Sequence, residues 1–189
     1  MARARSEPID RRGDPTMRTA FAACRTVAGM DHAHIPAAVI TVSDRSFRKE
    51  RADTSGPRAV ELLEQQGYAV SLTVIPDGAE SVTAGIQAAL AAGARIVITS
   101  GGTGVAPRDL TPEGTRPVLT REIPGIAEEL RREGASHTKM AVLSRGLVGI
   151  AGDALVVNLP GSTKAVEEGL EVVAPLIGHI LEQLDGGDH

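Results

Sequence analysis

The sequence feature that most constrains the fold is a short β-branched stretch that runs directly into glycines. Residues 96–99 read Ile-Val-Ile-Thr, and residues 100–104 read Ser-Gly-Gly-Thr-Gly. An uninterrupted apolar run of this kind is typical of a fully buried strand, and glycines permit the positive φ angles of a tight loop. Further on, Thr111 followed by Pro112 is typical of a helix start capped by the threonine. Strand, loop and helix start together predict an anion-binding site.

This loop differs from the two common phosphate-binding loops. A P-loop closes with a lysine, but no lysine lies between Lys49 and Lys139, and Pro107 stands where the Rossmann fingerprint has its third glycine. The loop instead leads to an acid, Asp109, so a phosphate held here would need a bridging divalent cation, which points to magnesium and a nucleotide. A plain βα turn with a solvated acid is the alternative interpretation.

Hydrophobic periodicity predicts alternating strands and helices in the rest of the chain. Strands are expected at residues 37–42, 68–75, 96–99 and 154–159, and short apolar pieces at 140–143 and 146–150. Helices are expected from Asp53 or Thr54 to Gly67, at residues 80–92, from Pro112, from Pro124 to Gly134, and after a Ser162 cap with a kink at Pro175. This order predicts an α/β fold, a three-layer α/β/α sandwich around a mainly parallel sheet.

Polar residues stand where the predicted strands end. Ser43 and Asp44 follow the first strand, Asp77 follows the second, residues 100–103 follow the third, and Asn158 closes the last. Ligands of open parallel sheets bind outside the carboxyl ends of the strands, so we expect one crevice lined by acids, hydroxyls and glycine amides. Two acids at such an edge suggest a metal pair, or a single magnesium with a triphosphate.

The composition argues against several classes of partner. A formal net charge of −4 disfavours a nucleic-acid or anionic-membrane surface, and an aromatic content of 2% leaves few stacking platforms for bases. The single cysteine, Cys24, allows no intrachain disulfide. No apolar run is long enough to span a bilayer. We therefore predict a cytoplasmic protein with no nucleic-acid and no membrane partner.

The N-terminal stretch differs from the rest of the chain. It is rich in arginine, and the apolar run after Phe21 is broken by Arg25, so it lacks the long apolar core of a secretory signal. We expect a disordered extension at residues 1–35, one functional domain at residues 36–185 and a tail at residues 186–189. Met17 is a second candidate start.

The strand ends belong to a series of longer motifs. In chain order these are Thr-Val-Ser-Asp-Arg at 41–45, Ile-Pro-Asp at 75–77, Thr-Ser-Gly-Gly-Thr-Gly at 99–104, Asp-Leu-Thr-Pro-Glu at 109–113, Leu-Ser-Arg-Gly at 143–146 and Val-Asn-Leu-Pro-Gly-Ser at 157–162. Together they resemble the Mog/MoaB family of molybdenum-cofactor biosynthesis proteins over roughly residues 36–185. Several motifs in the right order are far more specific than any one of them.

The resemblance implies a molybdopterin adenylyltransferase, which joins AMP from MgATP to the terminal phosphate of molybdopterin and releases pyrophosphate. By motif, Asp77 and Asp109 would be the catalytic acids and the Mg²⁺ ligands, and would position both phosphates for in-line attack; each could instead cap a neighbouring helix. The residues predicted to bind molybdopterin and nucleotide are Ser43, Asp44, Ser100, Gly101, Gly102, Thr103, Gly104, Thr111, Pro112, Glu113, Ser144, Asn158, Leu159, Pro160, Gly161 and Ser162.

Some of these assignments have an ordinary alternative. Residues 160–162 could be a plain helix cap, and Glu113 could face the pterin ring or only stabilise a helix start through the dipole. Lys164 is a weak phosphate candidate. Arg45 and Arg108 could neutralise phosphate or pair with nearby acids.

Two further hypotheses concern the whole protein. It could be a molybdopterin-binding or carrier protein of the MoaB type, without catalysis, or a competence-damage or MoeA-like relative, although those chains normally carry further domains. The resemblance also implies a homo-oligomer, commonly a trimer, and a possible partner protein that inserts molybdate. The apolar positions of the 124–134 helix could face a neighbouring subunit or simply the core.

Overall fold

The apolar runs of the sequence form one six-stranded sheet with the order β2-β1-β3-β6-β5-β4. The computed structural model describes residues 35–187; residues 1–34 and 188–189 of the predicted extension and tail lie outside the described residues. The strands are β1 Pro36–Val42, β2 Ala69–Ile75, β3 Ile96–Ser100, β4 Arg121–Glu122, β5 Val148–Ala151 and β6 Ala154–Leu159. The helices are α2 Asp44–Phe47, α3 Ser55–Glu64, α4 Ala79–Ala91, α5 Thr111–Thr115, α6 Pro124–His137 and α7 Thr163–Leu184, with 3₁₀ turns η1 Arg116–Val118 and η2 Lys139–Leu143.

Five of the six strands run in one direction, and β5 runs against them. β1 pairs in parallel with β2 and β3, and β3 with β6, whereas β5 runs antiparallel to β6 and β4 antiparallel to β5. The predicted mainly parallel sheet is confirmed. The antiparallel edge arises because only Gly152 and Asp153 separate β5 from β6, and such a short turn can join only antiparallel strands.

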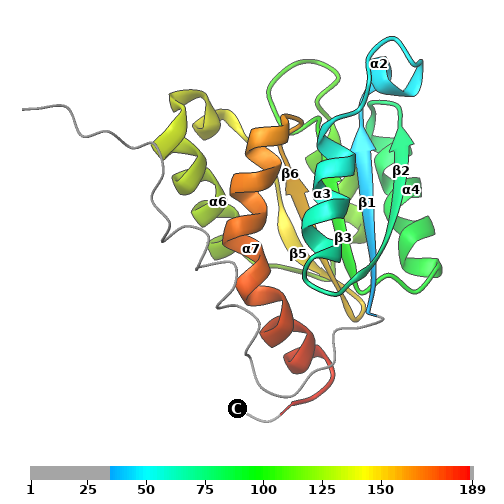
Figure 1. Ribbon diagram of the computed structural model, residues 1–189, viewed down its shortest axis with the longest axis vertical. Coiled ribbons are helices and arrows are strands. Elements are labelled where there is room, and N and C mark those ends of the chain that lie inside the picture. Colours follow the sequence, from blue (N-terminus) through cyan, green and yellow to red (C-terminus); the bar gives the residue numbers. More distant parts are fainter. Residues whose placement is uncertain (1–34, 188–189) are drawn as a thin grey trace, which may run out of the picture.

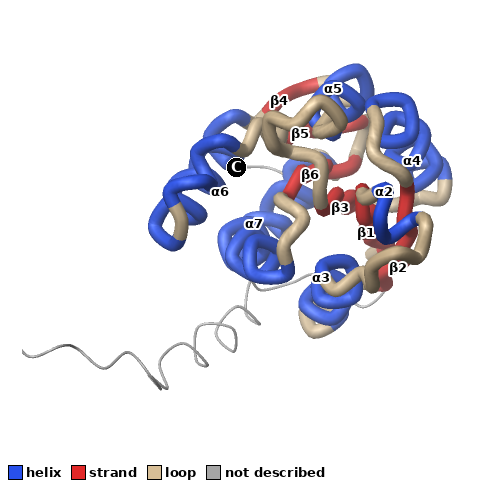
Figure 2. The backbone as a smooth tube through the Cα atoms, turned by 90° about the horizontal axis from the view of Figure 1, so that it is seen from above, coloured by secondary structure: helices blue, strands red, loops and turns tan. Residues whose placement is uncertain are grey.

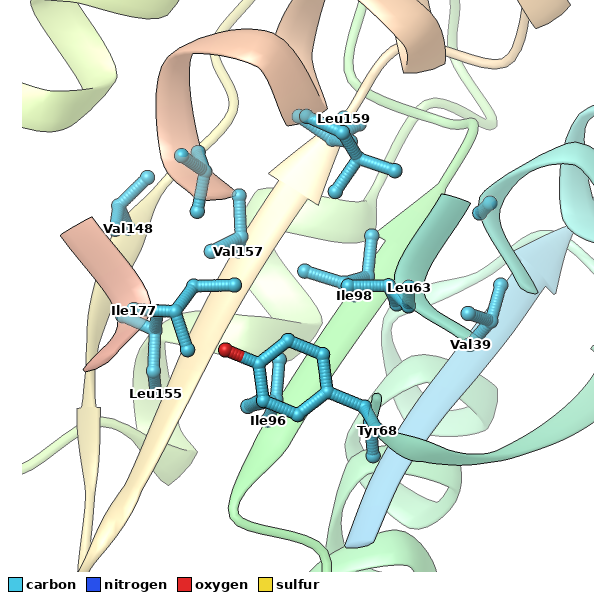
Figure 3. Close-up of a cluster of buried hydrophobic side chains, with 14 of the residues drawn as sticks. Val39, Leu63, Tyr68, Ile96, Ile98, Val148, Leu155, Val157, Leu159 and Ile177 are labelled. Carbon is cyan, nitrogen blue, oxygen red and sulfur yellow. The ribbon is translucent and has the colours of Figure 1, made fainter. Parts of the chain in front are cut away.

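Helices cover both faces of the sheet, which makes three layers (Figures 1 and 2). Successive side chains of a strand point to opposite faces, so Ile96 and Ile98 join the core under α3 and α7, whereas Val97 joins the core under α4. Figure 3 shows the first of these cores, in which Leu63 of α3 and Ile177 of α7 meet the strands. With a core on each face, the sheet is a rigid base for the loops at its carboxyl edge.

The long helix α7 follows its predicted pattern. Ser162 is the N-cap, and its Oγ accepts a hydrogen bond from the Ala165 amide at 3.2 Å. The helix continues through Pro175. Its buried apolar residues recur at helical spacing and face the sheet: Val166, Leu170, Val173, Ile177 and Leu181.

Two predicted helix ends were wrong. Thr111 does not cap α5: Leu110 is the N-cap, and the Thr111 hydroxyl donates to the Gly101 carbonyl at 2.8 Å. α6 passes through Gly134 to His137. In α6 the intrahelical hydrogen bonds continue past Gly134, so a glycine near the end of a helix does not have to stop it. The predicted end of α3 at Gly67 is confirmed: Gly67 has a φ of 95°, its amide donates to the Glu64 carbonyl at 2.9 Å, and the Tyr68 amide donates to the Leu63 carbonyl at 3.3 Å.

None of the helices in the described part of the chain combines the length and the apolarity that crossing a bilayer requires.

Candidate functional site

The loop after β3 needs its glycines for two distinct reasons. Gly101 has a φ of 115° and Gly102 a φ of 62°, which L side chains rarely adopt. A Cβ on Gly101 would also lie 2.3 Å from the carbonyl oxygen of Val42, and a Cβ on Gly102 would lie 2.4 Å from Oγ1 of Thr111. The glycines therefore let the loop turn sharply against β1 and α5, as the sequence predicted.

Two hollows meet at this loop. The larger hollow, of about 440 Å³, extends towards α6, η2 and the first turns of α7. The smaller hollow, of about 210 Å³, extends towards the segment after β1 and the start of α3. Gly102 and Gly161 line both hollows, so the glycine loop and the turn before α7 form the boundary between them.

The residues predicted for the site divide between these hollows. The smaller hollow contains Ser43, Asp77, Ser100, Gly101, Gly102 and Gly161. The larger hollow contains Gly102, Thr103, Gly104, Asp109, Ser144, Asn158, Leu159, Pro160, Gly161 and Ser162. The predicted residues that line neither of the two are Asp44, Thr111, Pro112 and Glu113. The expected single crevice is thus two adjoining hollows, with one of the two predicted acids in each.

Asp77 is held by the end of the first strand. Its Oδ2 accepts a hydrogen bond from the Asp44 amide at 2.8 Å, while Oδ1 of Asp44 accepts from the Asp77 amide at 3.2 Å. Arg108 joins this pair: its Nε lies 2.7 Å from Oδ2 of Asp44, and its Nη2 donates to the Asp77 carbonyl at 2.8 Å. The hydrogen bond from Arg108 lowers the pKa of Asp44, so this carboxylate stays ionised.

Asp109 lies on the larger hollow, five residues beyond Gly104 in the chain. Its Oδ2 accepts a hydrogen bond from the Ala106 amide at 2.9 Å, and its own amide donates to the Ala106 carbonyl at 2.9 Å. Oδ1 accepts no hydrogen bond from the residues that the structure describes. The turn therefore orients the carboxylate and leaves one oxygen for a ligand.

Glu113 is paired with an arginine from another motif. Both of its carboxylate oxygens accept hydrogen bonds from Arg145, which lowers the pKa of Glu113. Arg145 belongs to the Leu-Ser-Arg-Gly run, and its neighbour Ser144 lines the larger hollow. Of the two open interpretations of Glu113, the geometry favours a supporting role at the start of α5.

Asn158 and Thr111 have buried, fully engaged side chains. Nδ2 of Asn158 donates to Oγ1 of Thr99 at 2.9 Å and to Oγ1 of Thr115 at 3.0 Å, and its Oδ1 accepts from the Leu147 amide at 3.1 Å. Pro112 and Leu159 are buried as well. Asn158 and Leu159 therefore form part of the wall of the larger hollow, whereas Thr111 supports the glycine loop through its bond to the Gly101 carbonyl.

Sequence reasoning missed several polar residues of the two hollows. Arg51 and Asp53 line the smaller hollow, and Arg131 and Glu168 line the larger. Asp53 was considered only as a helix cap, yet the fold brings it back to the end of β1, where its Oδ2 accepts a hydrogen bond from Oγ1 of Thr41 at 2.7 Å. Arg131 lies on α6 and Glu168 lies on α7. The apolar pattern used to predict these helices does not show which of their polar residues face a hollow. Lys164, a weak phosphate candidate, lies 3.4 Å from Oε1 of Glu168.

Two carboxylates suit a magnesium ion that arrives with phosphates. Within residues 35–187 no group of three or more histidine, cysteine, aspartate or glutamate side chains could hold a metal ion by itself. Mg²⁺ usually keeps several waters and binds through one or two carboxylates together with substrate phosphates. Asp77 and Asp109, each with one oxygen that accepts no hydrogen bond from the described residues, fit that mode of binding.

Comparisons with known proteins agree on one family. A family model described as a probable molybdopterin binding domain matches residues 38–179. The chain is 40% identical over 157 residues to a molybdenum cofactor biosynthesis bifunctional protein of Chlorobaculum tepidum, covering 82% of this chain and 50% of the relative. It is 37% identical over 149 residues to a molybdopterin adenylyltransferase of Pyrococcus furiosus, covering 76% and 88%.

A solved structure extends the similarity to three dimensions. The molybdopterin biosynthesis Mog protein from Mycobacterium ulcerans superposes with a TM-score of 0.75 at 43% identity, covering 80% of this chain and 97% of that one. The chain spans about half the length of the bifunctional relatives that it matches.

Proposed function

We propose that this chain, which belongs to the family of molybdopterin-binding domains of molybdenum-cofactor biosynthesis, transfers AMP from ATP to the terminal phosphate of molybdopterin. The observation that carries the proposal is the pair of hollows that meet at the glycine loop, with Asp77 in one and Asp109 in the other. A two-substrate transfer needs two sites that share a boundary, because the reacting atoms must meet there. The adenylyltransferase of Pyrococcus furiosus is a relative over most of its length.

The proposed reaction is a displacement at the α-phosphorus of ATP. An oxygen of the molybdopterin phosphate forms a bond to that phosphorus, the bond to the bridging oxygen breaks, and pyrophosphate leaves with the electron pair. Catalysis of such a step depends on positioning and on charge neutralisation. The chain supplies backbone amides of the glycine loop as donors to phosphate oxygens, and Arg108 as a nearby cation. Asp77 and Asp109 would hold Mg²⁺, which when bound neutralises the charge of the triphosphate.

The test is a defined reaction that contains purified protein, molybdopterin, ATP and Mg²⁺, scored for adenylylated molybdopterin and pyrophosphate. We expect product from the native chain and none from Asp109→Asn, with molybdopterin binding retained. Asp153→Asn is the matched control, because its side chain is 75% exposed in the turn between β5 and β6, outside both hollows. Full turnover by Asp109→Asn would refute the role of Asp109.

A second candidate is a molybdopterin-binding or carrier protein without catalysis. Its support is the description of the matching family model, which specifies binding alone. Tight molybdopterin binding with neither ATP consumption nor product would establish it. The predicted cytoplasmic location, trimeric assembly and molybdate-inserting partner stay predictions under either function, and we keep residues 36–185 as the proposed domain.

A further inference from the structure

One arginine of the Leu-Ser-Arg-Gly run is bound to the loop that carries Asp109. Nε of Arg145 donates to the Gly104 carbonyl at 2.8 Å, and its Nη2 donates to the Asp109 carbonyl. The backbone amide of Arg145 donates to the Thr103 carbonyl at 2.8 Å. The guanidinium also binds the Glu113 carboxylate. A single residue from the segment after η2 therefore contacts both ends of the loop and the helix that follows it.

The two carbonyls that Arg145 binds bracket the turn that orients the Asp109 carboxylate. Inside that turn, Asp109 and Ala106 exchange two hydrogen bonds, from each backbone amide to an oxygen of the other residue. This exchange exists only while the turn keeps its shape. Residues 105–108 are exposed and contribute no buried apolar side chain to hold that shape. The Arg108 side chain ties the turn to Asp44 and to the Asp77 carbonyl, and the bonds of Arg145 to the Gly104 and Asp109 carbonyls hold the backbone at the two ends of the turn.

Arginine is suited to this task because its planar guanidinium presents several donors in a fixed geometry. A lysine could keep the charge pair with Glu113 but could not bind that carboxylate and both carbonyls together. The ion pair alone is a weak explanation, because the two side chains are 39% and 44% exposed, and exposed ion pairs contribute little to stability.

We propose that Arg145 is a positioning residue, which fixes the carboxylate of Asp109 at the larger hollow by holding the Gly104 and Asp109 carbonyls. The catalytic consequence rests on the proposed function, in which Asp109 acts on the phosphates. The structural statement, that Arg145 fixes this turn, holds for the protein without substrate.

The first experiment compares turnover by Arg145→Lys and Glu113→Gln. Arg145→Lys should lower kcat roughly a hundredfold, the size of effect that a misplaced catalytic group produces, with a KM for ATP within about threefold of the native value. Glu113→Gln removes the charge pair but leaves both carbonyl bonds, so it should cost clearly less turnover. Equal losses in the two variants would overturn the proposal in favour of an ion pair that acts through α5.

The second experiment measures hydrogen exchange by NMR on the full chain without substrate. The amides of Ala106 and Asp109 should exchange roughly tenfold faster in Arg145→Lys than in the native chain, because the turn opens locally. Arg116→Lys is the matched control: Arg116 pairs with Glu122 on an exposed surface, and its loss should leave both exchange and turnover unchanged.

The two experiments separate failure of this inference from failure of the proposed function. If the native chain makes no product, the adenylyl transfer fails, and the exchange rates still decide whether Arg145 fixes the turn. Unchanged exchange in Arg145→Lys overturns the inference, whatever the turnover. Faster exchange, with a loss of kcat larger than that of Glu113→Gln, establishes it.

Discussion

Asp44 and Asp77 each donate a backbone amide hydrogen bond to the carboxylate of the other. This reciprocal pair ties the residue that opens α2, just beyond β1, to the residue that follows β2. Arg108 adds a cation to this pair, because its guanidinium binds the Asp44 carboxylate and donates to the Asp77 carbonyl. Because Arg108 also precedes Asp109 in the chain, the same side chain connects the smaller hollow with the loop that lines the larger one.

This arrangement predicts an acid-sensitive contribution of Asp44 to stability. The pKa of Asp44 is lowered from 3.8, chiefly by the hydrogen bond from Arg108. A lowered folded-state pKa gives stability that is present above the unfolded value and is lost as the pH falls through the folded value. The free energy of unfolding, measured with urea from about pH 6 to about pH 2, should therefore fall below pH 3.8 less steeply in Asp44→Asn than in the native chain. Equal slopes would contradict the prediction.

Asn158 should be essential for stability because its buried amide joins three separate segments. Asn158→Ala leaves the hydroxyl of Thr99, the hydroxyl of Thr115 and the amide of Leu147 without their partner. Unsatisfied buried groups predict a loss of about 2–4 kcal/mol in the free energy of unfolding. Gln87→Ala, which removes an exposed amide from α4, should change it by less than about 0.5 kcal/mol. Denaturant titration measures the free energy of unfolding of both variants. Similar losses in the two would contradict the prediction.

Two glycines allow the cost of a positive φ to be separated from the cost of a backbone clash. Gly93 has a φ of 89° and no atom within 4 Å of the position that a Cβ would take, whereas Gly101 has a φ of 115° and the Val42 carbonyl oxygen 2.3 Å from that position. Gly93→Ala should cost about 1 kcal/mol from backbone strain alone. Gly101→Ala should cost roughly 3 kcal/mol or more, because β1 must also move. Thermal unfolding measures the melting temperature of both variants. Equal decreases would mean that the loop at Gly101 moves to accommodate the Cβ at no extra cost.

Glu171 should destabilise the protein at neutral pH. Although its side chain is exposed, partial desolvation raises its pKa above 4.5, and the nearby Glu133, Glu167 and Glu168 add to the shift. For an acid with a raised folded-state pKa, stability is lost as the pH rises above the unfolded value. Glu171→Gln should therefore raise the melting temperature by about 1–2 °C at pH 7. At a pH below 4.5 the gain should disappear.

The control for this prediction is Glu128→Gln, which replaces an exposed glutamate on α6. Its melting temperature should follow the native one at both pH values. A gain from Glu171→Gln that persists in acid would assign the effect to packing and would exclude ionisation as its cause.

The layered fold was predictable because its signals are local. Apolar runs such as residues 96–99 mark strands wherever both faces are covered, and their alternation with helices leads to a mainly parallel sheet. The same logic predicted that polar residues gather at the carboxyl edge of the parallel strands, where the two hollows lie. Thr111 shows the limit of local signals. It has the composition of a cap, but the nearby Gly101 carbonyl attracts its hydroxyl instead.

The sequence by itself determined the order of the elements, the edge of the sheet at which polar residues gather, and the need for glycine after β3. Only the tertiary structure decided how those polar residues are used. It divided the expected crevice into two hollows, engaged Asn158 within the core, and paired Glu113 with Arg145, 32 residues away. The physical reason is distance. Burial and backbone conformation depend largely on neighbouring residues in the chain. A hydrogen bond between side chains that are distant in the sequence forms only when packing brings them within bonding distance.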